Sequence, residues 1–134
     1  MKDFFGDLII RIKNGNRVKA KTISMHPHMP KYCYAFLNVL RDEGYILGYQ
    51  QSIDKTTNKL VINVLLKYNN MGVPAIRNIY QISKPGRRIY WSTKALWKPK
   101  STGGLLILMT PQGFLTDRDA RLLNIGGEVF CGIY

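Results

Sequence analysis

The sequence predicts an α+β protein of two small domains. An N-terminal α/β domain is expected over residues 1–70, and a mainly β C-terminal domain with one short helix over residues 71–134. Two observations support this class. The spacing of apolar residues is helical near the N-terminus and alternates further along, which is typical of helices followed by strands. The chain has 134 residues, 46% of them hydrophobic, enough for one compact domain or two small halves.

The first half contains two predicted helices and three predicted strands. In order, the expected elements are a helix over 3–14, a strand over 21–25, a turn over 26–30, a helix from 30 to 44, and strands over 45–53 and 59–68. Phe4, Leu8 and Ile12 lie on one face of the first helix, and Gly15 is expected to end it. Pro30 suits the first position of the second helix, and Gly44 its end.

The second half is mostly strand, and it begins after a boundary near residues 70–74. Its expected elements are strands over 76–83, 87–91 and 105–109, a turn over 111–113, a helix from 116 to 125, and a strand over 128–134. Thr116 resembles the start of a capping box, with Asp119 in place of the usual Glu or Gln.

The charge is strongly positive and unevenly distributed. The chain has twenty Lys and Arg residues and eight Asp and Glu residues, which gives a net charge of +12. No acidic residue lies between Asp54 and Asp117, a stretch that holds ten cations: Lys55, Lys59, Lys67, Arg77, Lys84, Arg87, Arg88, Lys94, Lys98 and Lys100. Tyr and Trp residues are interspersed there, and aromatic rings among cations suit RNA, whose unstacked bases offer flat faces. The pattern predicts a polyanion-binding face.

Several other functions find no support in the residues. The longest apolar stretch, residues 105–109, is far too short to span a membrane, and the N-terminal residues resemble neither a secretory signal nor a transit peptide. His26 and His28 lack further metal ligands and are expected to be exposed turn residues, whereas Cys33 and Cys131 are expected in the core. The pairs Gly103-Gly104 and Gly126-Gly127 lack the spacing of a nucleotide-binding loop. We therefore expect no enzymatic activity, no cofactor and no metal.

Four short segments carry specialised chemistry. Residues 83–90 form a Pro-Gly turn that presents Lys84, Arg87 and Arg88 for phosphates and is followed by Tyr90. Residues 109–113 form a tight loop with a hydroxyl and an amide, those of Thr110 and Gln112. Residues 116–121 place two Arg beside two Asp, and residues 126–128 bring two glycines next to a carboxylate.

In this order, and with the segments Asp7–Gly15 and Leu40–Ile46 before them, these motifs resemble the bacterial-type ribosomal protein S-eight family of the small subunit. The resemblance covers essentially the whole chain. It implies two small domains and a structural protein that binds the central domain of small-subunit ribosomal RNA early in assembly, beside neighbouring small-subunit proteins. It implies no catalysis, no membrane and no DNA.

The resemblance also implies an RNA contact in the C-terminal half. With the turn cations and the loop amide, the candidate RNA-binding residues are Lys84, Arg87, Arg88, Tyr90, Thr110, Gln112, Gly113, Gly126, Gly127 and Glu128. The loop departs from the family pattern, because Met109 stands where a serine is expected and Pro111 removes a backbone donor. Trp91 and Trp97 are a second departure, since polar surface residues are expected there.

Glu128 is an anion within a cationic face, and two explanations are open. We expect it to accept hydrogen bonds from donors of the loop over 110–113. The alternative is a carboxylate paired with a nearby Arg.

The expected location follows from the divergence and from the few residues before the first helix, which leave no room for an import sequence. We expect a mitochondrial ribosome with an organelle-encoded gene, and a plastid or the bacterial cytoplasm as alternatives. A stand-alone RNA-binding regulator of messenger RNA is the alternative function. A basic hydrolase and a membrane-surface protein are weaker alternatives, since the sequence lacks a carboxylate cluster and a basic amphipathic helix.

Overall fold

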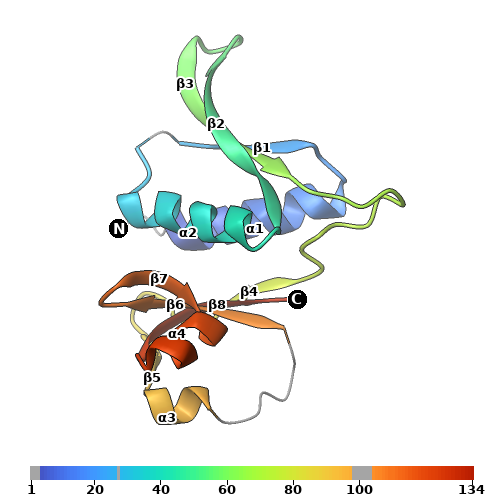
Figure 1. The fold of residues 1–134 in the computed structure, drawn as a ribbon. Helices are drawn as coiled ribbons and strands as arrows, with labels where there is room; N and C mark the ends of the chain where they lie inside the picture. The colour runs from blue at the N-terminus through green and yellow to red at the C-terminus, as the bar shows by residue number, and fades with distance from the viewer. Residues whose placement is uncertain (1–3, 27, 98–103) are drawn as a thin grey trace. The chain divides into compact units, whose positions relative to one another are not determined.

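The chain is described by a computed structural model over residues 4–26, 28–97 and 104–134, and its helices and antiparallel sheets confirm the α+β class (Figure 1). It divides into two compact units, Met1–Arg77 and Asn78–Tyr134. Separate domains with a boundary at residue 70 stay a prediction. Pro27 of the expected turn, the cations Lys98 and Lys100, and Gly103 lie outside the described residues.

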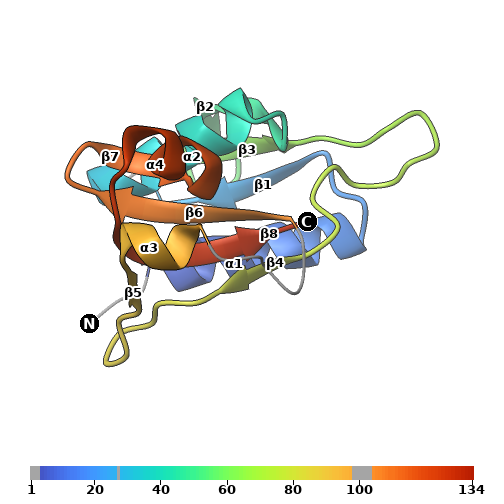
Figure 2. The same ribbon diagram turned by 60° about the horizontal axis from the view of Figure 1, so that its bottom comes forward.

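Unit 1 is a three-stranded antiparallel sheet with two helices along one face (Figures 1 and 2). Its elements are α1 (Phe4–Arg17), β1 (Thr22–Met25), α2 (Lys31–Asp42), β2 (Ile46–Asp54) and β3 (Lys59–Leu66), and the strand order is β1-β3-β2. The rings of Phe5 and Phe36 pack edge to face, with their centroids 4.7 Å apart, and join the two helices. Pro30 is the N-cap of α2 and not its first residue, so the helix begins one residue later than predicted, at Lys31.

Gly15 does not end the first helix, contrary to the prediction. It is buried inside α1, which continues to Arg17. A methyl group at Gly15 would lie 2.6 Å from Cγ2 of Ile23 and 2.9 Å from Cδ1 of Leu66. Glycine is therefore present because α1 approaches β1 and β3 too closely for a side chain. The chain turns away only at Lys19, which adopts a φ of +57°.

The β2–β3 hairpin extends beyond the end of β1 (Figure 1). Strand β1 pairs with β3 only from Ile62 to Leu65, so residues 59–61 of β3 pair with β2 alone. Asp54 closes the turn, because its carboxylate accepts hydrogen bonds from the N–H of Thr56 at 3.0 Å and from its hydroxyl at 2.6 Å. These bonds hold the pKa of Asp54 below its usual value.

Unit 2 is a five-stranded antiparallel sheet with two short helices against one face (Figure 2). Its elements are β4 (Ile79–Gln81), β5 (Tyr90–Trp91), α3 (Thr93–Leu96), β6 (Leu105–Thr110), β7 (Gly113–Thr116), α4 (Asp117–Leu123) and β8 (Gly127–Ile133). The strand order is β4-β8-β6-β7, and β5 also pairs with β8. The core under the helices consists of Leu96, Leu106, Leu108, Ala120 and Val129.

Three features of unit 2 differ from the prediction. The sequence pattern missed α3 and β7, which have only four residues each, too few for a periodic signal. The strands expected over 76–83 and 87–91 are reduced to β4 and β5. Trp91 is not a surface residue, because it is partly buried against the core of unit 2, whereas Trp97 is exposed as expected.

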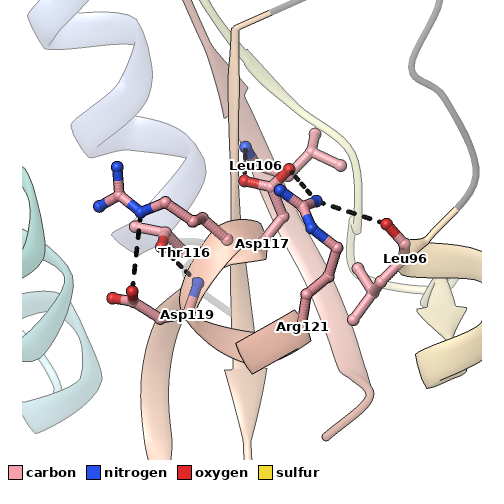
Figure 3. A network of polar contacts seen from close by, with 7 residues as sticks. Leu96, Leu106, Thr116, Asp117, Asp119 and Arg121 are labelled. Atoms are coloured by element: carbon pink, nitrogen blue, oxygen red, sulfur yellow. Dashed lines mark hydrogen bonds and ion pairs between the residues drawn. The ribbon is translucent and has the colours of Figure 1, made fainter. Parts of the chain in front are cut away.

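A buried carboxylate ties the helices of unit 2 to its sheet (Figure 3). Asp117 is only 1% exposed. It accepts a hydrogen bond from the backbone N–H of Leu106 at 3.2 Å and an ion pair from Arg121 at 3.0 Å. The same guanidinium donates to the carbonyl of Leu96 at 3.3 Å, so one pair joins α4, β6 and α3. Thr116 caps α4 as predicted, since its hydroxyl accepts from the N–H of Asp119 at 3.1 Å.

Replacing Asp117 with Ala should lower the free energy of unfolding by about 3–5 kcal/mol, because it leaves the partly buried Arg121 without its counter-charge. The matched control is Asp119→Ala. Asp119 also lies in the first turn of α4, but its ion pair with Arg118 is half exposed, and we expect a cost of about 1 kcal/mol or less. Urea denaturation of both variants measures the difference. Equal losses would show that the buried pair does not hold unit 2 together.

Candidate nucleic-acid interface

The predicted turn at residues 84–87 forms a tight, cation-bearing loop. Lys84 and Arg87 exchange backbone hydrogen bonds of 3.0 and 2.8 Å. Pro85 and Gly86 occupy the corner, where Gly86 has a φ of +84° that other residues rarely adopt. The side chains of Lys84 and Arg87 are exposed, and within the described part of the chain neither pairs with a carboxylate. Both charges are thus available to an anionic partner.

Ser83 fixes the base of this turn, a role that sequence reasoning missed. Its side chain is 2% exposed. Its hydroxyl accepts a hydrogen bond from the N–H of Ile89 at 2.9 Å and lies 3.3 Å from the carbonyl oxygen of the same residue, to which it donates. That carbonyl also accepts the N–H of Val129 in β8 at 2.9 Å. The turn is therefore closed on itself and attached to the sheet.

Tyr90 follows the turn on β5, at the edge of β8. It pairs with Glu128, and Trp91 pairs with Gly127. Tyr90 is 69% exposed, whereas its neighbour Trp91 is partly buried and packs against the core. The short strand therefore anchors itself through one aromatic ring and presents the other to solvent.

The side chain of Glu128 pairs with Arg88. The expectation that it accepts hydrogen bonds from the loop over 110–113 is therefore wrong. Nη1 of Arg88 lies 3.3 Å from Oε2 of Glu128. The side chain of Glu128 is 14% exposed and that of Arg88 is 51% exposed. The alternative explanation, a carboxylate paired with an Arg, is the one that holds. Register explains why: Glu128 lies opposite Tyr90, two residues after Arg88.

The loop between β6 and β7 uses its hydroxyl internally. Thr110 is buried, and its hydroxyl donates to the carbonyl of Gly113 at 2.8 Å and accepts from the N–H of Gln112 at 3.1 Å. Thr110 therefore shapes the loop. The exposed groups are the side chains of Pro111 and Gln112, and Gly113 has a φ of +100°.

Gly126 and Gly127 allow close packing of the chain on itself. A methyl group at Gly126 would lie 2.6 Å from the carbonyl oxygen of Trp91, and one at Gly127 would collide with the carbonyl oxygen of Met109. These glycines bring the start of β8 against β5 on one side and β6 on the other. The structure thus gathers the candidates around the start of β8, with Lys84 and Arg87 at the outer end of the turn.

The remaining titratable candidates lie where the sequence suggested. Cys33 and Cys131 are both buried, and burial raises the pKa of Cys131 far above its usual value, so it stays protonated. His26 and His28 are exposed. Among the described residues, no three His, Cys, Asp or Glu gather in a way that could hold a metal ion. None of the described helices is long and apolar enough to cross a membrane.

The family model and the similar proteins all point to the same family. A sequence model of the family described as "Ribosomal protein S8" matches residues 3–134. The small ribosomal subunit protein uS8 of Azorhizobium caulinodans is 44% identical over 135 residues, which cover 100% of this chain and 98% of that protein. The uS8 proteins of Bartonella bacilliformis and Brucella anthropi are 43% and 40% identical, again over 100% of this chain and 98% of each relative. These relatives are bacterial.

Replacing Ser83 with Ala should loosen the turn. The variant loses both hydrogen bonds to Ile89, and a buried group left unpaired typically costs about 1–3 kcal/mol. We expect that loss in the free energy of unfolding, together with lower backbone ¹⁵N order parameters over residues 84–88. Ser92→Ala is the control, because Ser92 caps the short helix α3 outside the turn. Unchanged order parameters in the Ser83 variant would show that the turn is rigid without this hydroxyl.

Proposed function

The chain belongs to the ribosomal protein S8 family, whose role in the small ribosomal subunit is structural, and we propose that this chain binds the central domain of small-subunit ribosomal RNA and thereby supports subunit assembly and translation. The observation that carries the proposal is the turn after Ser83. It holds two cations, Lys84 and Arg87, that have no carboxylate partner among the described residues, on a backbone that is hydrogen-bonded to the sheet.

The chemistry of this surface suits RNA. Exposed cations on a fixed loop contact phosphates without having to be ordered first, so less conformational entropy is lost on binding. The exposed ring of Tyr90 offers a face on which an unstacked base or a sugar can pack. The carboxylate of Glu128 offsets part of the positive charge of Arg88 and restrains its guanidinium. Arg88 therefore contributes a guanidinium held in a fixed orientation more than a full positive charge.

The preferred RNA is a helix with internal irregularities, and not DNA. The major groove of a regular A-form helix is too narrow for side chains to read, so contacts must go to a distorted and accessible minor groove or to unpaired bases. The net charge of +12 adds a sequence-independent attraction to any polyanion, and specificity must come from the fixed geometry around β8.

Unit 2, from Asn78 to Tyr134, is proposed as the RNA-binding domain, with neighbouring ribosomal proteins as further partners. The bacterial relatives favour the bacterial cytoplasm, one of the two alternatives to the expected mitochondrion, and they give no support to the mitochondrion itself or to a plastid. Nor do they support a stand-alone regulator of messenger RNA.

Replacing Arg87 with Ala should weaken binding to a fragment of the rRNA central domain and flatten its salt dependence. Each phosphate interaction that the substitution removes should reduce the slope of log affinity against log salt by about one unit or less. Filter binding between about 50 and 200 mM salt measures it. The control, Lys55→Ala, removes the same charge from the β2–β3 turn of unit 1. Lys55→Ala should keep the wild-type slope. If Arg87→Ala kept it as well, the turn after Ser83 would not contact phosphate.

A further inference from the structure

Unit 1 contains a pocket of about 510 Å³ that the contacts proposed above leave unused. It lies where β1 ends. Met25, the last residue of β1, is opposite Ile62, and residues 59–61 of β3 continue past it and line the pocket. The other walls come from residues 24–26 and His28, from Thr57 in the hairpin turn, and from Arg11 of α1. Three separate segments of unit 1 thus converge on one hollow.

The polar lining is suited to a phosphate. Arg11 and Lys59 supply two cations, and no described lining residue is acidic. Arg11 is held in place, since its Nη1 donates to the carbonyl of Ser24 at 3.0 Å and its Nε pairs with Asp7 at 3.2 Å. A guanidinium has five N–H donors, so these two bonds orient it and leave others for a ligand. Within the described residues, Lys59 has no carboxylate paired with it.

The rest of the lining is suited to a planar ring. The ring centroids of His26 and His28 lie 5.0 Å apart. The backbone N–H of His28 donates to Nδ1 of the His26 ring at 3.1 Å, which restrains the two residues relative to each other. Met25, Leu60 and Val61 supply apolar surface. Pockets for small ligands typically measure about 300–1,000 Å³ and combine apolar walls with a few polar groups. The hollow is in that range.

From this lining we propose that the pocket binds one unstacked nucleotide of the ribosomal RNA, with its base against the imidazoles and apolar wall and its phosphate at Arg11 and Lys59. This proposal rests on the proposed function, because it adds a second RNA contact in unit 1 to the one in unit 2. RNA is favoured over a free nucleotide, because sequence-specific RNA recognition targets unpaired bases that stack on aromatic side chains. It is favoured over a protein strand paired to the free edge of β3, because such pairing uses backbone groups and would not require two cations at the rim.

Two variants test the pocket in full-length protein bound to a complete central-domain rRNA fragment. Lys59→Ala removes one of the two cations that line the pocket, and Val61→Trp fills the pocket while leaving every charge in place. Each should weaken binding roughly tenfold. Each should also expose one unpaired nucleotide to chemical probing while keeping the protections that Arg87→Ala removes. Lys55→Ala, an exposed cation of the same hairpin outside the pocket, should leave that nucleotide protected.

The outcomes separate the pocket from the proposed function. No binding of the rRNA fragment by the wild-type protein would overturn the proposed function. Wild-type binding that neither pocket variant changes would overturn the pocket alone. Loss of a neighbouring protein from assembled subunits, with unchanged affinity for protein-free RNA, would reassign the pocket to a protein partner. Saturation by free adenosine 5′-monophosphate at micromolar concentration, followed through the ring-proton resonances of His26 and His28, would reassign it to a small-molecule ligand.

Discussion

The close approach of β8 to its neighbours at Gly126 and Gly127 is the constraint on which unit 2 depends. Strand β8 pairs with β4 and β5 on one side and with β6 on the other, so it holds together most of the sheet. At its start there is no space for a side chain, because the carbonyls of Trp91 and Met109 occupy that volume. Any larger residue there would push β8 away from β5 or from β6 and move the candidate residues on these strands.

The charged groups of unit 2 divide into two kinds according to burial. Asp117 and Arg121 form a buried pair that joins helices to sheet, and such pairs are costly to break. Lys84 and Arg87 are exposed and unpaired among the described residues, so they contribute little to stability and remain available to a ligand. Arg88 lies between these cases, since Glu128 restrains it at a half-exposed site. The exposed cations of unit 2 thus lie on a fold whose buried charges, those of Asp117 and Arg121, neutralise each other.

Long, periodic elements could be predicted from the sequence, and contacts between distant segments could not. The helix of residues 31–42 and the hairpin of residues 46–66 follow from their apolar spacing, and strand β6 follows from an uninterrupted apolar run. The expectation for Gly15 is wrong because glycine serves both to end helices and to permit close packing, and only the structure shows Ile23 and Leu66 against it. The partner expected for Glu128 is wrong because its bond with Arg88 spans 40 residues and depends on the register of β5 against β8.

A cryo-EM map of the small ribosomal subunit that contains this chain tests the central claim most directly, that β8 and the turn after Ser83 form an RNA-binding surface. The account predicts that Lys84, Arg87 and Tyr90 contact RNA of the central domain, with Arg88 still bonded to Glu128. A map in which this surface faces solvent or another protein, and the RNA contacts lie elsewhere on the chain, would contradict it.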